Sequence, residues 1–282
     1  VNVELVRVQQ TPSALAALQA GEGEMANIGV DALLQAIAAG ATDLRAVASP
    51  NKALPFLIAA RDDITTVENL AGASFGVGRI GSLDHSLSSL VLDSMGADIE
   101  QSQIVTLGQP NVRAQALAAG QIDATTMSIG TWLSLPDTTG LHVLVDQDAY
   151  FAAAPLVNKV NAVPGNVLAE RPDDVAAVIR ALIRISRDVA ADPQLWVDGM
   201  AEALPNADTA VLDALVTSFA TSWSVNGGMS ADELAYTADW LYGTEDFSAA
   251  TPLALADWVS FAPADAALAT LGTAEGMDPA DR

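Results

Sequence analysis

The stretch ALAAGQIDATTMS, residues 116–128, has the pattern of a helix end, a glycine turn and a short buried strand. The stretch ALQAGEGEMANIG, residues 17–29, repeats this order, again with a glycine and an acid between helix and strand. Because any helix-to-strand turn favours glycine and an acid, the repeat has two interpretations. It is either ordinary turn chemistry, or it marks two similarly wound lobes that each point a strand end at a shared crevice.

Outward from these stretches, roughly the first 160 residues alternate β-rich runs with amphipathic helical runs. Val1–Val8 is expected to be a strand. Thr11 and Pro12 are expected to open the first helix, as its N-cap and its first helical residue. Alternation of this kind predicts an α/β protein with mostly parallel sheets and crossover helices.

The chain after Pro164 is predicted to be mainly helical. Pro172–Ala191 has two aspartates in its first turn, apolar residues at the helical period and arginines further along. This order suits both an amphipathic helix and the helix dipole. We expect this half of the chain to form a helical C-terminal wrap around the first lobe, and not a separate catalytic domain.

The composition favours two lobes and disfavours nucleic acid as a partner. The chain has 282 residues, of which 51% are hydrophobic, and this length suits two lobes of roughly 100–150 residues each. Twelve Lys and Arg against 35 Asp and Glu give a formal net charge of −23, which repels phosphate backbones. No apolar run approaches the ~18–20 residues that cross a bilayer.

The chain contains no cysteine, which excludes thiol catalysis, thiolate metal sites and disulfides. This composition fits an exported protein, although it also fits many cytosolic proteins. No signal peptide precedes the strand-like segment Val1–Val8. We therefore interpret the sequence as a processed or trimmed form.

The segment Gly76–Gly81 matches the dinucleotide fingerprint G-x-G-x-x-G between a predicted strand and a predicted helix. The next strand ends in glycine and glutamine at 108–109, where a dinucleotide site needs an acid for the ribose, so this interpretation is the weaker one. The same turn could instead hold a carboxylate, sulfonate or phosphate, with helix amides helped by Arg79, Ser82 and His85. Alternatively, Ser82 only caps the helix and Arg79 is solvated.

Catalytic constellations are poorly supported by the sequence. Ser82, Asp84 and His85 are neighbours on one helical turn and point in different directions, so they cannot form a hydrolase relay among themselves. Residues 126–130 fall one glycine short of the G-x-S-x-G elbow. Two isolated histidines without thiols disfavour a transition-metal site. We expect no catalytic residues, no metal and no cofactor.

Three segments together resemble the sulfonate- and nitrate-type binding proteins of ABC transporters. Residues 15–29 resemble that family's "allsGevDfa" segment, and residues 67–77, VENLAGASFGV, look like its "dLkGKkigv" segment. Residues 116–124, ALAAGQIDA, match its second-lobe "aLaaGqvDa" segment. The segments occur in the family's order, which is much more specific than any one motif.

The resemblance implies the type II periplasmic binding protein fold, with two α/β lobes, two crossovers and a ligand between the lobes. The first lobe would comprise residues 1–72 and 152–282, and the second lobe residues 73–151, with hinges near 71–74 and 151–155. With His85 added from the glycine-rich turn, the expected ligand contacts are Thr11, Pro12, Ser13, Gly29, Val30, Asp31, Ser49, Asn51, Arg79, Ile80, Gly81, Ser82, His85, Ser128, Ile129 and Thr131.

Two departures from the family pattern bear on these expectations. The family opens with a strand, a ligand-contacting loop and a helix before the segment that matches Val1–Val8. Their absence here removes a wall of the site, or the true start lies upstream. A eukaryotic branch of the superfamily makes a thiamine pyrimidine precursor, with a cysteine-rich segment and an active-site histidine. The absence of cysteine makes that enzyme a poor match.

The function implied by the resemblance is capture of a small organic molecule for ABC-type import. The expected partner is an ABC permease in the membrane, and the expected form is an exported monomer, periplasmic or lipid-anchored outside the cytoplasmic membrane. The ligand would be a small anion such as a sulfonate or carboxylate, or an uncharged heterocycle or aromatic. The alternatives are a ligand-binding sensor of the same fold and a dinucleotide-dependent oxidoreductase.

Overall fold

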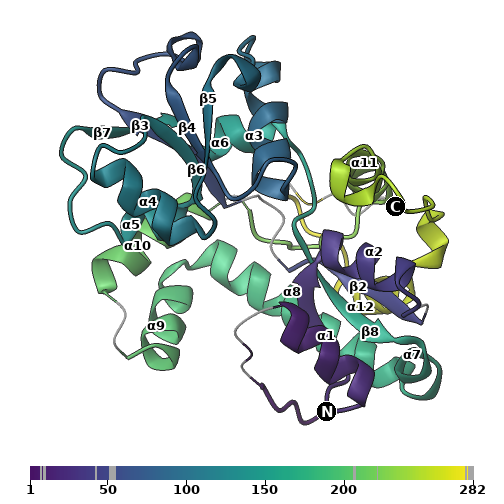
Figure 1. The fold of residues 1–282 in the computed structure, drawn as a ribbon. Helices are drawn as coiled ribbons and strands as arrows, with labels where there is room; N and C mark the ends of the chain where they lie inside the picture. The colour runs from purple at the N-terminus through teal and green to yellow at the C-terminus, as the bar shows by residue number, and fades with distance from the viewer. Residues whose placement is uncertain are drawn as a thin grey trace.

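The structure is a computed structural model, and it describes residues 1–6, 8, 11–41, 43–50, 55–205, 208–220, 222–276 and 278. Its strands form two separate sheets (Figure 1), which define two lobes. The sheet of the first lobe has the strand order β1 (Ala26–Gly29), β8 (Lys159–Pro164) and β2 (Leu44–Ala48). The sheet of the second lobe has the order β5 (Gln103–Thr106), β4 (Ser74–Val77), β6 (Ala124–Ser128), β3 (Phe56–Arg61) and β7 (Leu141–Val145).

One continuous core holds the first lobe together. Ile28, Val47 and Val160 from the three strands pack there with Leu33 of α2 (Val30–Ala38) and Ile179 of α8 (Pro172–Ala191). The helices around this sheet are α1 (Thr11–Ala20), α2 (Val30–Ala38), α7 (Gly165–Glu170), α8 (Pro172–Ala191), α11 (Ala231–Tyr242) and α12 (Ala262–Leu271). The buried residues of α8 recur at about the helical period, as its sequence predicts.

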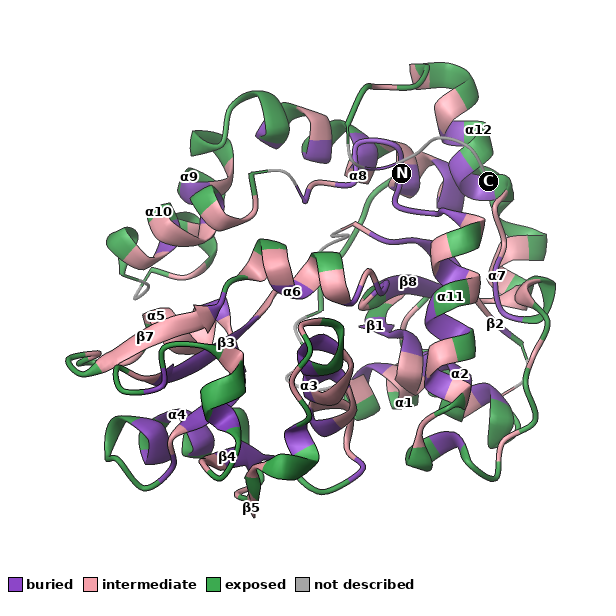
Figure 2. Ribbon diagram, turned by 90° about the horizontal axis from the view of Figure 1, so that it is seen from above, coloured by how far each residue is buried: buried purple, intermediate pink, exposed green. Residues whose placement is uncertain are grey.

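The second lobe has helices on both faces of its sheet. In β3, Ile58 and Ala60 pack with one core cluster, whereas Leu57 and Ala59 pack with the other, because successive side chains of a strand point to opposite faces. The helices α3 (Leu83–Ser94) and α6 (Gln147–Ala153) cover the first face, and α4 (Pro110–Ala118) and α5 (Ile129–Leu133) cover the second. Buried residues line the strands and the inner sides of these helices (Figure 2).

The C-terminal wrap reaches both lobes. From α8 the chain enters α9 (Gln194–Ala203) and α10 (Thr209–Ser218), which lie below the second sheet in Figure 1. Leu215 and Phe219 pack against the second-lobe cluster beside α5. The wrap is therefore not confined to the first lobe, in contrast to the sequence-based expectation.

The expectation of mostly parallel sheets is wrong in its detail, although the two-lobed α/β class is confirmed. Parallel pairing joins β4 to β5 and to β6. The pairs β1–β8, β2–β8, β3–β6 and β3–β7 are antiparallel. The two strands responsible, β3 and β8, are the first strands after the chain changes lobes. Both strands run antiparallel to their neighbours, which belong to local strand–helix units.

The chain changes lobes at different residues from those expected. Because β3 lies inside the second sheet, the first crossing falls between Ala48 and Phe56 and not near 71–74. The return crossing lies at Leu156, which packs with the second-lobe core, and Val157, which packs with the first. The local sequence could not place the crossings, because sheet membership depends on distant partners.

The expected strand Val1–Val8 is absent from the described residues 1–6 and 8, which have no regular structure. Their apolar side chains are exposed, including Leu5 at 92%. A strand needs a partner for its backbone groups. The edge strand β1 of the first-lobe sheet pairs only with β8 among the described strands, so the N-terminal residues do not extend this sheet. In the described part of the chain, no helix is long and apolar enough to span a bilayer.

Candidate ligand-binding site

Strand ends that lead directly into helices supply the predicted contact residues. β1 ends at Gly29 and α2 begins at Val30, whereas β6 ends at Ser128 and α5 begins at Ile129. Each junction follows a helix that ends in a glycine with positive φ, Gly21 or Gly120. The repeated sequence pattern therefore corresponds to the same local structure in both lobes.

A pocket of about 390 Å³ lies at the end of the second sheet. Phe56, the first residue of β3 after the crossing, lines it, and so does Leu83, which also packs with the first-lobe core. Because Leu83 packs against the cores of both lobes, the pocket lies on the side of the second lobe that meets the first. The full lining is Phe56, Leu83, Asp84, Leu87, Gly108, Gln109, Pro110, Arg113, Thr126, Met127, Ser128 and Thr131.

Arg113 and Asp84 are the two charged residues of this lining, and they lie side by side. Arg113 Nη2 is 3.4 Å from Asp84 Oδ2, and the Arg113 side chain is only 4% exposed. Arg113 also donates hydrogen bonds to Gly108 O, Thr125 Oγ1 and Thr126 O. Burial lowers the pKa of Arg113, and the neighbouring carboxylate of Asp84 opposes that shift.

The glycine-rich turn before α3 uses its donors within the chain. Gly78 N donates to Asp84 Oδ2 at 2.7 Å, and Arg79 N donates to Ser82 Oγ at 3.2 Å. Ser82 Oγ donates to Asp84 Oδ1 at 2.6 Å. Asp84 therefore occupies the place in which the sequence predicts an external anion. An internal carboxylate there also disfavours a pyrophosphate, and thus the dinucleotide interpretation.

The guanidinium of Arg79 forms an ion pair and does not face solvent alone. Its Nη2 atom donates to both carboxylate oxygens of Asp246, at 2.7 and 3.0 Å, and this contact raises the pKa of Arg79. Asp246 belongs to the short helix η3 (Glu245–Phe247) that follows α11, so the ion pair joins the two lobes. Gly81 lies against Glu245 of the same helix, and Ile80 is 58% exposed.

His85 is turned into the protein and supports the turn from within. Its Nδ1 accepts a hydrogen bond from Gly81 N at 3.2 Å, and its Nε2 lies 3.5 Å from Glu100 Oε1. Ser82 bonds to Asp84 while His85 bonds to Gly81. The hydrolase relay that the sequence disfavours is therefore also not formed in the structure.

The junction after β6 contributes two of its three predicted residues to the pocket. Ser128 and Thr131 line it, with their hydroxyl oxygens 2.9 Å apart, and Ser128 Oγ accepts from Thr131 N. The Ile129 side chain packs in the core of the lobe.

The predicted first-lobe residues lie at the strand ends, apart from the pocket lining. Gly29 and Val30 are buried, and burial raises the pKa of Asp31, with Lys159 and Asp246 among the charges that act on it. Ser49 Oγ donates to Lys159 O at 2.8 Å. The charge of Asp246 therefore acts on Asp31, and Asp246 in turn forms the ion pair with Arg79 of the second lobe.

The remaining predicted residues belong to α1 or lie outside the described residues. Thr11, Pro12 and Ser13 form the first turn of α1, where Thr11 is half-buried and the other two are exposed. Asn51 lies outside the described residues. Thr11, Pro12 and Ser13 are not part of the second-lobe pocket lining.

The sequence-based prediction missed Arg113, Gln109 and the apolar wall of the pocket. A signal for Arg113 was present, because it shares one helix face with Ala116 and Leu117, at spacings of three and four residues. A basic residue on a buried helix face needs polar partners. Phe56 stood near a predicted strand end, where an aromatic is more often core than ligand platform.

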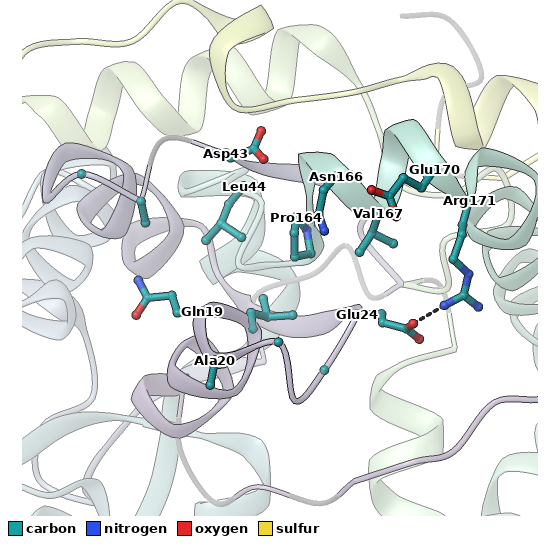
Figure 3. A pocket seen from close by; sticks show the side chains of 15 residues that line it. Gln19, Ala20, Glu24, Asp43, Leu44, Pro164, Asn166, Val167, Glu170 and Arg171 are labelled. Atoms are coloured by element: carbon teal, nitrogen blue, oxygen red, sulfur yellow. Dashed lines mark hydrogen bonds and ion pairs between the residues drawn. The ribbon is translucent and has the colours of Figure 1, made fainter.

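A second, larger pocket of about 610 Å³ lies at the opposite ends of the first-lobe strands (Figure 3). It is lined by the ends of α1 and α2, by the start of β2 and by α7. Glu24 at its edge forms an ion pair with Arg171 (Figure 3). None of the predicted site residues that the structure describes lines this pocket.

The two α/β lobes, linked by two crossings and with strand-to-helix junctions in each, define the periplasmic-binding-protein fold. The chain belongs to the NMT1/THI5-like family, whose model matches residues 1–195. No curated protein sequence matches the chain significantly.

Three solved structures illustrate the similarity. The periplasmic aliphatic sulphonate binding protein SsuA from Escherichia coli has 17% identity and a TM-score of 0.73, over 90% of this chain and 80% of that chain. The zinc-bound ligand binding component of an ABC-type import system from Staphylococcus aureus has 16% identity and a TM-score of 0.71, over 93% and 87%. A cysteine-to-serine mutant of DszB, in complex with biphenyl-2-sulfinic acid, has 16% identity and a TM-score of 0.68, over 93% and 90%.

Proposed function

We propose that this protein captures a small organic molecule between its lobes and delivers it to an ABC permease. The observation that carries the proposal is the pocket of about 390 Å³ at the lobe junction, built from strand ends and helix starts. Pockets of this size and mixed lining suit small ligands. The similarity to binding components of import systems supports the same function.

In this proposal both lobes contribute contacts to the ligand. Ser128 and Thr131 act from the second lobe, and the strand end at Gly29–Asp31 and Ser49 act from the first. A ligand that touches both sides stabilises the closed arrangement, because it makes its full set of contacts only there. The permease would then recognise the surfaces of the two closed lobes.

We propose no chemical step for this protein. DszB, a structural neighbour, was solved as a cysteine-to-serine mutant with biphenyl-2-sulfinic acid bound. The cysteine that was replaced there has no counterpart here, since this chain has no cysteine. The side chains in the pocket that could transfer protons are committed to each other, as Asp84 and Arg113 are. Binding and release are sufficient for the proposed role.

The cellular location and the oligomeric state follow from the same proposal. We place the protein outside the cytoplasmic membrane, in the periplasm or held there by a lipid anchor, and as a monomer that meets its permease. Light scattering of the purified protein would test the monomer, and fractionation of cells would test the location. A dimer in which the pocket is covered would contradict this part.

A thermal-shift screen with charge-matched pairs of small molecules tests the function. The probes are benzoate and benzamide, nicotinate and nicotinamide, and methanesulfonate and dimethyl sulfone. A true ligand at 100 times its dissociation constant should add about 2.7 kcal/mol of stability, and X-ray scattering should show a smaller radius of gyration with it.

A variant of the pocket provides the control. Thr131→Leu removes a lining hydroxyl and adds bulk, so it should reduce the ligand-induced shift. Ser134→Leu, at an exposed position just after α5, should leave the shift unchanged. The proposal fails if no probe stabilises the protein and none changes its radius of gyration.

A further inference from the structure

The arginines at the lobe junction already form ion pairs with aspartates of the protein, and this affects which charge a ligand of the pocket can carry. Two arginines bear on this question: Arg113 lines the pocket, and Arg79 belongs to the glycine-rich turn before α3, the helix that supplies Asp84. Arg79 is held by both oxygens of Asp246, and Arg113 lies 3.4 Å from Asp84. Neither guanidinium is an uncompensated positive charge that would attract an anion.

We propose that Asp84 is the residue that sets ligand specificity, and that it makes this pocket select uncharged molecules over anions. The inference rests on the proposed function and names the ligand class of the same site. The ligand would be a neutral organic molecule with a compact apolar body and at least one polar group.

The position of Asp84 is fixed by several contacts. Its Oδ2 accepts from Gly78 N, its Oδ1 accepts from Ser82 Oγ, and its backbone O accepts from Ser88 Oγ at 2.6 Å. A side chain at position 78 would meet the carboxylate at 2.9 Å, so the glycine there permits this close approach. The carboxylate therefore takes the backbone and hydroxyl donors that would otherwise face a bound anion.

Arg113 has few donors left for a ligand. It gives hydrogen bonds to Gly108 O at 2.6 Å, and to Thr126 O and Thr125 Oγ1, both at 3.3 Å. The fourth contact is Asp84 itself. Because a guanidinium has five N–H groups in a fixed plane, most of its hydrogen-bonding capacity is used inside the lobe.

The rest of the lining suits a neutral guest. Phe56, Leu83, Leu87 and Met127 supply apolar surface. The hydroxyls of Ser128 and Thr131, which bond to each other, and the amide of Gln109 can donate or accept hydrogen bonds without a net charge. An anion in this lining would meet the Asp84 carboxylate, and the lining offers no free cation to offset the repulsion.

The substitution Asp84→Asn tests the inference, with the charge-matched pairs as probes and calorimetry or NMR titration as the readout. In the wild type we expect benzamide to bind more tightly than benzoate. In Asp84→Asn the charge of Arg113 is no longer neutralised, so benzoate should bind at least about tenfold more tightly while benzamide changes by less than about threefold.

Asp93→Asn is the matched control, because it removes the same charge from an exposed position on the same helix. It should leave both affinities unchanged, which separates a local effect from the general negative field of the protein. If Asp84→Asn does not fold, Arg113→Gln replaces it. That variant keeps the carboxylate and removes its cation, so benzoate binding should be lost while benzamide binding is retained.

Two outcomes would overturn the inference. One is tighter binding of the anionic member of a pair by the wild type, and the other is an equal change for both members in Asp84→Asn. Either outcome leaves the proposed capture function standing, since a ligand still binds. If no member of any pair binds, the proposed function fails and this inference fails with it.

Discussion

At the scale of single residues, Asp31 is notable because its carboxyl group is partly buried at the start of α2. Burial raises its pKa, and the nearby Asp246 acts in the same direction, whereas hydrogen bonds from backbone amides and the charge of Lys159 act against this shift. The raised value means that the ionised carboxylate is held at a cost in the folded protein. Such a cost is acceptable at a position that faces a ligand or the other lobe.

The substitution Asp31→Asn should stabilise the protein at pH 7. The folded pKa lies above the unfolded pKa, so the wild type loses stability as the pH rises through this interval, and Asn does not. We expect a modest rise in the melting temperature at pH 7 and a smaller difference below about pH 3.8, where both forms are neutral. Scanning calorimetry at both pH values measures it, with Asp239→Asn on exposed surface as the control. An equal effect at both pH values would contradict the explanation.

At the scale of elements, the turn before β6 shows how a short acidic motif sets strand pairing. Asp123 Oδ2 accepts from Ser74 N at 2.8 Å and from Ser74 Oγ at 2.7 Å, and β4 pairs with β6 next to this contact. These bonds lower the pKa of Asp123, with a smaller contribution from the charge of Arg61. The acid of the sequence motif therefore anchors one strand to the next.

Asp123→Asn should weaken the second lobe at neutral pH by about 1–2 kcal/mol, since a charge-assisted hydrogen bond is lost. The folded pKa lies below the unfolded one, so this stabilisation is present above about pH 4 and is lost as the pH falls through the folded value. Urea unfolding at pH 7 and pH 3 measures the difference between variant and wild type. A double-mutant cycle with Ser74→Ala should give a coupling energy at pH 7, and zero coupling would contradict the role of this contact.

Local turns were predictable from the sequence, but strand partners were not. The glycine and acid signals placed the junctions at Gly29 and Ser128 because they act over a few residues. Whether an N-terminal segment pairs as a strand, and in which direction β3 and β8 run, depends on partner strands far away in the sequence, which the local pattern does not contain. Near the candidate site, the strand ends at Gly29 and Ser128 were predictable. The Asp84–Arg113 pair was not, since it joins two helices, α3 and α4, that only the folded chain brings together.

At the scale of the whole molecule, the lobes are joined by more than their two crossings. Arg79 pairs with Asp246, and the wrap helices carry Leu215 and Phe219 onto the second lobe. The ion pair is exposed, so it contributes little to stability, typically below about 1 kcal/mol. Its position still favours the arrangement in which the lobes touch.

Asp246→Asn should therefore change the arrangement of the lobes more than it changes stability. We expect a larger radius of gyration for the unliganded variant in X-ray scattering, with a melting temperature close to that of the wild type. Raising the salt to about 1 M should expand the wild type in the same way, because it screens exposed ion pairs. A variant as compact as the wild type at low salt would show that Arg79 does not hold the lobes together.

The return crossing concentrates the change of lobe into one peptide unit, since Leu156 and Val157 belong to different cores. Val157 N also donates to Thr237 Oγ1 of α11, which ties the chain to the first lobe immediately after the crossing. At this crossing, a rotation of one lobe has to be absorbed by the few backbone torsions around Leu156 and Val157, so a small angular change there moves the distant strand ends by a large distance. Restricting the backbone at this crossing, for example with a proline, would limit the rotation of the two lobes without changing any residue proposed to contact the ligand.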